Sequence, residues 1–163
     1  MAINDSREFE KYFKKIYPPE LILQKENITN TETTFLDIRM IIENKTFKYK
    51  IYDKRDNFGF PINRLPFKSS NIPSRIFYNC INAEILRIFR ASSKVEYAVE
   101  TSTKLIKRML HQGQKLVTST KKEAELNNIF NGILRCLNKH TSILDKYSKS
   151  AAELVALLKR SVK

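Results

Sequence analysis

The sequence predicts an α+β fold: a small antiparallel β-hairpin or sheet with an N-terminal helix, followed by a helical bundle. Residues 34–73 contain two stretches in which apolar side chains alternate with others, as in strands with one buried face. Residues 73–163 instead repeat their apolar side chains at spacings of three and four, which is typical of amphipathic helices. We expect three parts: an α+β segment at 1–72, helices at 73–116 and a C-terminal helical pair at 117–163.

The chain opens with a predicted short helix that Ser6 caps and that Pro18 and Pro19 end. Residues 20–25 are a short strand candidate. A polar connection at residues 27–33 then leads into the hairpin.

The two strands of the hairpin are predicted at residues 35–42 and 46–54. If Asn44 and Lys45 form a two-residue turn, which Asn favours because it tolerates positive φ, the register follows. The facing pairs on one side are then wholly apolar: Ile42 with Phe47, Met40 with Tyr49 and Ile38 with Ile51.

The opposite face of this hairpin is basic, with aromatic rings interleaved. It places Arg39 beside Lys50, Ile41 beside Lys48, Asp37 beside Tyr52, and Phe35 beside Lys54. Such a mixture suits a nucleic-acid backbone and its bases. The alternative is an amphipathic hairpin whose outer face is simply solvated.

The first helix after the hairpin is predicted to start near Pro73, whose missing N–H needs no partner in a first turn, with Ser70 or Asn71 as the cap. Its apolar face comprises Phe77, Cys80, Ile81, Ile85 and Ile88. Its other face carries Arg75, Asn79, Asn82 and Arg90, with Arg87 on the flank. These arginines are either solvated or bind phosphate, for which their planar fork is suited.

The second helix is predicted from a capping box, Ser93 with Glu96, to about Gln112, where Gly113 ends it. Three cations lie together near its C-terminal end: Lys104, Lys107 and Arg108. The helix dipole favours cations there, so part of this cluster needs no ligand.

The last third contains a further capping box, Thr120 with Glu123, and two apolar stripes on either side of His140. They form either an antiparallel pair broken near His140, with Thr141 as the new cap, or one long helix with a phase slip. We favour the pair. An apolar surface of this length must be buried, on the preceding helices or on another subunit.

The formal charge of +13 is unevenly distributed. Residues 1–33 hold 5 Lys and Arg against 6 Asp and Glu, whereas residues 34–163 hold 25 against 11. The hairpin and helices therefore have the positive field that phosphate binding requires. No stretch approaches the ~20 apolar residues of a membrane span, and no apolar signal-peptide core opens the chain. We expect an intracellular protein, in cytoplasm or nucleus, without a membrane partner.

Four segments, FLDIRM, IYDKRDNFGFPI, SSNIPSRIFYNCINAEILRIFRAS and LIKRMLHQG, resemble in this order the region downstream of the catalytic motif in eukaryotic retroelement reverse transcriptases, nearest to the Penelope-like group. The resemblance covers about residues 7–114. It implies that the hairpin is a primer grip, that the following helices are thumb-like, and that together they hold an RNA or DNA duplex.

The YxDD motif of that family does not occur in this sequence. Asp37, Asp53 and Asp56 are the acids of the hairpin region, and we expect Asp53 and Asp56 to pair with Lys54 and Arg55 at the exit of the second strand. The expected role is thus binding without catalytic activity of this chain alone. No cofactor is expected, since a divalent metal would need the palm residues of the polymerase.

The expected partners are an RNA or DNA duplex and, through the C-terminal helices, the rest of a polymerase or a second copy. A helical interaction or scaffolding module derived from a retroelement is the alternative. The predicted nucleic-acid-binding residues are Arg39, Lys48, Lys50, Tyr52, Lys54, Arg55, Arg75, Arg87, Arg90, Lys104, Lys107 and Arg108.

Overall fold

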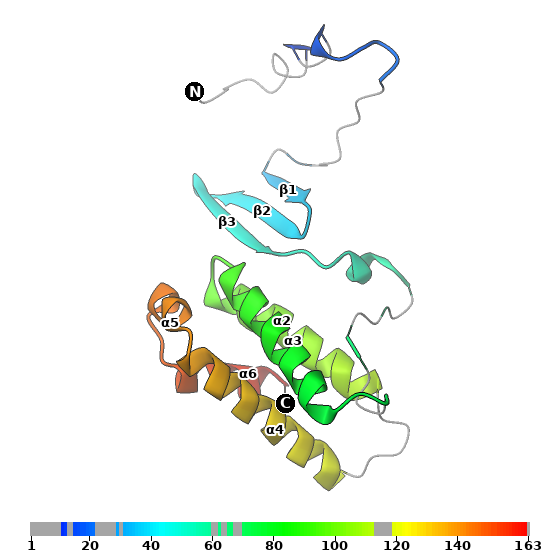
Figure 1. The fold of residues 1–163 in the computed structure, drawn as a ribbon. Helices are drawn as coiled ribbons and strands as arrows, with labels where there is room; N and C mark the ends of the chain where they lie inside the picture. Colours follow the sequence, from blue (N-terminus) through cyan, green and yellow to red (C-terminus); the bar gives the residue numbers. More distant parts are fainter. Residues whose placement is uncertain are drawn as a thin grey trace.

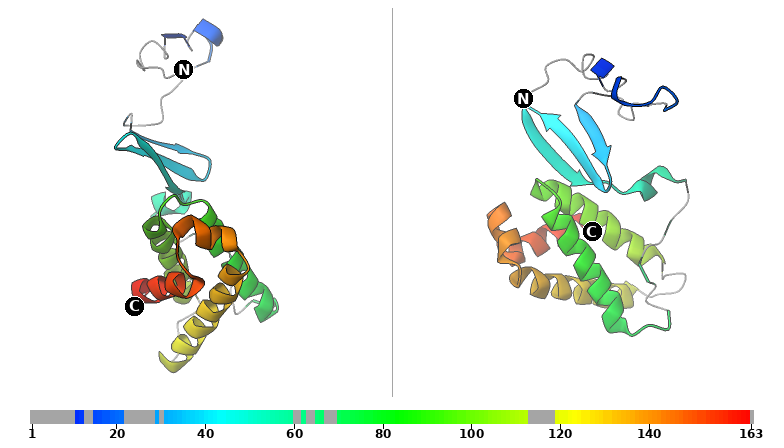
Figure 2. Two further views of the ribbon diagram at one scale, coloured as in Figure 1. Left: turned by 90° about the vertical axis from the view of Figure 1, so that its left-hand side faces the viewer. Right: turned by 45° about the horizontal axis from the view of Figure 1, so that its top comes forward.

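The computed structural model describes residues 11–12, 15–21, 29, 31–59, 62, 65–66, 70–112 and 119–162, with backbone alone at 56, 111–112 and 119–121. A three-stranded antiparallel sheet stands at one end of a helical bundle, which confirms the predicted α+β class (Figures 1 and 2). In chain order the elements are β1 (Glu32–Phe35), β2 (Ile38–Glu43), β3 (Thr46–Ile51), the 3-10 helix η1 (Lys54–Asn57), α2 (Ser74–Arg90), α3 (Val95–Gln112), α4 (Ser119–Asn138), α5 (Thr141–Tyr147) and α6 (Ala151–Val162).

The β2–β3 hairpin has the predicted register. Ile42 pairs with Phe47, Met40 with Tyr49 and Ile38 with Ile51. Asn44 and Lys45 have φ angles of 52° and 60°, as expected for a two-residue turn that matches the twist of the strands. The backbone preference of Asn44 and the alternation of the strands therefore agree, and the register follows from local sequence.

The predicted first strand, residues 35–42, is divided in the structure. Phe35 ends β1 and pairs with Ile38, so that Leu36 and Asp37 form a second tight turn. β1 also contains residues 32–34, of which 32 and 33 were predicted to belong to the polar connection. As a result β2 is the central strand, with β1 and β3 on its two sides.

The apolar face of the hairpin is buried at one end only. Ile51, next to the helices, is 7% exposed, whereas Phe47 at the other end of β3 is 75% exposed and Ile42 is 42% exposed. The base of the hairpin thus belongs to the core and its tip does not.

Helices α2, α3, α4 and α6 enclose one hydrophobic core. α2 packs on α3 and α4, and α6 packs on α3 and α4. Residues on both sides of the predicted boundary at 116/117 contribute to the same cluster, so the helical parts form one unit. The least exposed large apolar side chains are Phe89, Ile81, Ile85, Ile106, Ile129, Ile133, Leu137, Ile143, Leu154 and Leu158.

The predicted break near His140 is confirmed, and the single long helix is therefore wrong. His140 rather than Thr141 occupies the N-cap position of α5, without a side-chain cap. Residues 141–162 form two helices instead of one, because Ser150 and Glu153 make a capping box that starts α6. The Ser150 N–H donates to Glu153 Oε2 at 2.7 Å, and the Glu153 N–H donates to Ser150 Oγ at 3.2 Å.

Two other predicted caps are wrong. Pro73, rather than Ser70 or Asn71, is the N-cap residue of α2, and it provides no side-chain cap. Ser93 lies two residues before the start of α3 and bonds to β3 instead of to Glu96. A tertiary hydrogen bond therefore replaces the local one that the sequence favours.

The turn between α2 and α3 is held by the short helix α5. The Tyr147 hydroxyl lies 2.6 Å from the Phe89 carbonyl oxygen and 2.7 Å from that of Ser92, and Lys146 donates to the Arg90 carbonyl at 2.8 Å. These side chains satisfy carbonyls at the end of α2 that have no partner within the helix. Burial raises the pKa of Tyr147, which keeps its hydroxyl protonated as a donor.

The N-terminal predictions lie largely outside the described residues, although residues 11–12 and 15–16 have helical backbone. Gly113 and the capping side chain of Thr120 are likewise outside the described part. No helix in the ranges described here is both long enough and apolar enough to cross a membrane.

Candidate nucleic-acid interface

Strand β3 and its continuation run alongside α3, joined at both ends. At one end the Ser93 N–H donates to the Tyr49 carbonyl at 2.8 Å, and the Tyr49 N–H donates to Ser93 Oγ at 2.9 Å. At the other end Arg108 Nη1 donates to Asp53 Oδ2 at 2.8 Å. From Lys94 to Arg108 the helical side of this contact is about 20 Å long, whereas the extended segment between the two joints, Tyr49 to Asp53, covers about 13 Å.

One face of α3 is directed towards this strand. Its residues recur at spacings of three and four: Lys94, Tyr97, Thr101, Lys104 and Arg108. Thr101, Lys104 and Arg108 line a cavity with the strand, and Tyr97 contacts Lys50 of β3. We call the strip between residues 48–54 and this face of α3 the β3–α3 groove.

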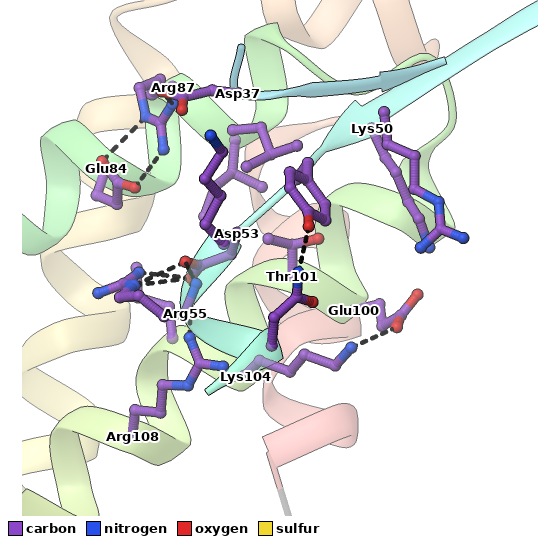
Figure 3. A pocket seen from close by; sticks show the side chains of 17 residues that line it. Asp37, Lys50, Asp53, Arg55, Glu84, Arg87, Glu100, Thr101, Lys104 and Arg108 are labelled. Carbon is purple, nitrogen blue, oxygen red and sulfur yellow. Dashed lines mark hydrogen bonds and ion pairs between the residues drawn. The ribbon is translucent and has the colours of Figure 1, made fainter. Parts of the chain in front are cut away.

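A cavity of about 300 Å³ occupies much of the β3–α3 groove (Figure 3). Eight of the twelve predicted binding residues line it. They come from β2, β3, η1, α2 and α3: Arg39, Lys50, Tyr52, Lys54, Arg55, Arg87, Lys104 and Arg108. Residues up to 69 positions apart in the sequence therefore meet at one place.

The other four predicted residues lie elsewhere. Lys48 lies at the end of the groove beside Lys94 but does not line the cavity, and Lys107 is exposed on α3 outside the cavity lining. Arg90 Nη2 is 3.2 Å from His140 Nδ1, towards the turn between α4 and α5. Arg75 is at the start of α2, about 18 Å along the helix from Arg87 and about a third of a turn around it.

Part of the predicted polar face of α2 is covered by another helix. Asn82 faces Gly132 of α4, where an added Cβ would lie 3.0 Å from the Asn82 side chain. Gly132 thus permits close packing of α2 and α4. The face that we expected to approach a ligand is partly covered by α4, and only its Arg87 end reaches the groove.

Asp53 is the centre of the charge network in the cavity. Arg55 donates to both of its oxygens, with Nε to Oδ1 at 2.7 Å and Nη2 to Oδ2 at 2.6 Å, and Arg108 adds a third guanidinium contact from α3. Burial alone would raise the pKa of Asp53, but the hydrogen bonds and charge of Arg55, aided by Arg108, lower it to about 2. The expected pairing with Arg55 is present, and Arg108 joins it from a distant helix.

The three other acids in the cavity pair with predicted binding residues. Arg87 Nη2 donates to Glu84 Oε1 at 2.7 Å and Nη1 to Asp37 Oδ2 at 3.4 Å, and hydrogen bonding to Glu84 raises the pKa of Arg87. Lys104 donates to Glu100 at 2.9 Å and lowers the pKa of that carboxyl group. Seven cationic and four acidic side chains line the cavity, so it has a positive excess.

A second group of cations lies where α3 begins. Lys50 Nζ is 5.3 Å and Lys94 Nζ is 5.6 Å from the centre of the Tyr97 ring. Lys48 is next to Lys94, and both form ion pairs with Glu43, that of Lys94 at 3.6 Å. Contact with Lys94 lowers the pKa of Lys48, as expected for neighbouring like charges.

Lys94 and Tyr97 were not among the binding residues predicted from the sequence. Their spacing of three and four from Lys104 and Arg108 is a signal that could have placed them on the same helical face. The spacing does not tell which side of the helix the hairpin covers, because that depends on tertiary packing.

Among the described side chains, no three His, Cys, Asp or Glu residues come together as a metal site would require. No family model matches the sequence, and no curated protein or solved structure matches it either.

Proposed function

We propose that this chain binds the phosphate backbone of an RNA or DNA duplex along the β3–α3 groove, as the primer grip and thumb of a reverse transcriptase-like protein do. The observation that supports this most is the convergence of eight predicted residues on one cavity with an excess of positive charge. The proposal gives the chain a holding role and no catalytic step.

The dimensions of the groove suit a nucleic-acid strand. Its length of about 20 Å corresponds to about six base steps at 3.4 Å each. Lys48, Lys50 and Lys54 lie along one side, and Lys94 and Lys104 along the other. Contacts of this kind fix position on a backbone but do not distinguish sequence.

A protein-interaction module is the second candidate, and the tip of the hairpin favours it. Phe47 and Ile42 are 75% and 42% exposed, which leaves an apolar surface that a protein partner could cover. The apolar faces of α4 and α6 do not have this property, because they are buried within the bundle. A partner or second copy would therefore dock on the hairpin rather than on the C-terminal helices.

A pair of charge-reversed variants separates the two candidates. Lys50→Glu with Lys54→Glu alters the groove, and Lys122→Glu with Lys139→Glu makes the same charge change at exposed positions on α4 and the following turn. In low salt we expect the groove variant to bind a short labelled duplex at least about tenfold more weakly, and the control to change affinity less than about twofold. Fluorescence anisotropy gives both affinities.

Equal losses in the two variants would mean that only overall charge matters, and would contradict a specific groove. Unchanged duplex affinity in the groove variant would favour the protein-interaction module.

A further inference from the structure

A second, wider hollow adjoins the β3–α3 groove. It has a volume of about 750 Å³ and lies between β1, the turn after it, β2 and the exit of β3. Its lining shares four residues with the first cavity: Arg39, Tyr52, Lys54 and Asn57. Asn57 donates to the Tyr52 hydroxyl at 2.5 Å, so the shared wall is held in place by its own hydrogen bond. We call this second space the side hollow.

The side hollow differs from the first cavity in chemistry. Three of its ten lining residues are charged, and two of these, Glu32 and Arg39, form an ion pair with each other. Lys54 is the remaining cation. The rest of the lining consists of hydroxyl and amide groups, Thr29, Thr33, Thr34, Tyr52 and Asn57, and of two apolar side chains, Leu36 and Phe58.

The two apolar side chains are unusually placed for a loop and a turn. Leu36 is 72% exposed and has a φ of 53°, a left-handed conformation that a leucine rarely adopts. Phe58 is 50% exposed directly after η1. A leucine at positive φ and a half-exposed ring line the same hollow, and backbone outliers of this kind cluster at ligand sites.

A nucleotide that is not base-paired fits this set of groups. An aromatic ring stacks on any base, hydroxyl and amide groups bond to base edges or sugar, and one ammonium group binds one phosphate. The volume is in the range of small-ligand sites. A base inside a duplex exposes only its edges and could not stack on Phe58.

We propose that the side hollow binds an unpaired nucleotide at the end of one strand of the duplex, with its base against Phe58 and Leu36 and its phosphate at Lys54. This inference rests on the proposed function, because the backbone held in the β3–α3 groove delivers the strand end. Tyr52 and Asn57 line both spaces, so the side hollow lies directly beside the groove.

The test compares duplexes that carry a short single-stranded end, at either the 3′ or the 5′ terminus, with or without bases. An abasic overhang has the same phosphates as a normal one, so their difference in affinity isolates base stacking. We expect the wild-type chain to bind one normal overhang about tenfold more tightly than its abasic counterpart. Phe58→Ala should abolish this ratio while leaving the affinity for a blunt duplex unchanged, and Phe58→Tyr should retain it.

Leu36→Asn is a second variant that should keep the fold, since Asn tolerates positive φ in a two-residue turn. It should reduce the ratio as well. Lys50→Glu should weaken binding of all duplexes alike and keep the ratio.

Equal affinity of the wild-type chain for normal and abasic ends would overturn the side hollow as a nucleotide site and leave the duplex proposal standing. A Phe58→Ala variant that weakens blunt and overhanging duplexes equally would also overturn it, since Phe58 would then serve only the fold. No binding of any duplex would overturn the proposed function and this inference together.

Discussion

The two ends of the β3–α3 groove use their charges differently. At the Asp53 end, Arg55 and Arg108 both donate to one carboxylate, and Arg87 nearby pairs with Glu84 and Asp37. At the Tyr97 end, Lys48 and Lys94 share the carboxylate of Glu43, and Lys50 lies against the ring. The three arginines at the first end face three acids, whereas the three lysines at the second end have one carboxylate, Glu43, that two of them share.

This difference separates the charges that hold the fold from those available to a ligand. The Asp53–Arg108 pair joins segments 55 residues apart, and loss of Asp53 leaves uncompensated charge in a partly buried place. The lysines at the Tyr97 end are repelled by one another and gain from an added anion. Changes at the first end should therefore act on stability, and changes at the second on binding.

The largest expected effect is at Asp53. Asp53→Asn removes the negative charge to which Arg55 and Arg108 donate. The Asp53 side chain is only 20% exposed. We expect the free energy of unfolding to fall by about 2 kcal/mol, less than for a fully buried pair because solvent partly screens Asp53 and Arg108. Urea denaturation at neutral pH measures it, with the exposed Asp145→Asn as control. A loss as small as that of the control would place Asp53 among the solvated charges.

The stability should also depend on pH through the Asp53 carboxylate. The pKa of Asp53 in the folded chain is about 2, below its unfolded value, so its stabilisation is present above about pH 4 and is lost as the pH falls towards 2. We expect the gap in unfolding free energy between wild type and Asp53→Asn to narrow by about 1.5 kcal/mol over that interval, since solvent screens part of the interaction. Urea denaturation across the interval tests this, and a constant gap would contradict the assignment.

At the Tyr97 end we expect the opposite pattern. Lys48→Gln with Lys94→Gln should weaken duplex binding about tenfold in low salt, since two phosphate partners are lost. The free energy of unfolding should change by no more than about 0.5 kcal/mol. Lys122→Gln with Lys139→Gln is the matched control. Anisotropy and urea denaturation on the same samples separate the two effects, and a large loss of stability without a loss of affinity would reverse the comparison.

The smallest effect is expected at Ser93, which attaches the edge of β3 to the start of α3. Ser93→Ala removes the hydroxyl bonds to Tyr49 N and O, at 2.9 and 3.0 Å, but keeps the backbone bond. We expect a loss of about 1 kcal/mol in unfolding free energy. Ser161→Ala, at an exposed position on α6, should change it little. Equal values for the two would mean that Ser93 does not position the groove.

The hairpin could be predicted from the sequence because its signals are local. Alternation fixes the faces, and Asn44 fixes the turn, so the register of β2 and β3 followed without tertiary information. β1 was missed because its turn, Leu36–Asp37, puts a leucine at positive φ, which no turn preference suggests. The capping box at Ser150 and Glu153 is also a local signal in the sequence, although it was not predicted.

The groove could be predicted only in part. Lys50, Tyr52 and Lys54 share a strand or its exit, and Lys104 and Arg108 share a helical face, so their grouping was visible in the spacing. The contact of Arg108 with Asp53, and the covering of Asn82 by α4, depend on how distant segments pack. Ser93 shows the same limit, since its hydroxyl bonds to the edge of β3 instead of capping α3.

The salt dependence of duplex affinity tests the central claim most directly. Five lysines lie along the groove: Lys48, Lys50, Lys54, Lys94 and Lys104. They predict that the logarithm of the association constant falls with the logarithm of salt concentration with a slope of about −4.5. The slope should be less steep by about 2 in the Lys48→Gln, Lys94→Gln variant and unchanged in its matched control. A slope near zero, or equal slopes in variant and control, would contradict phosphate binding in this groove.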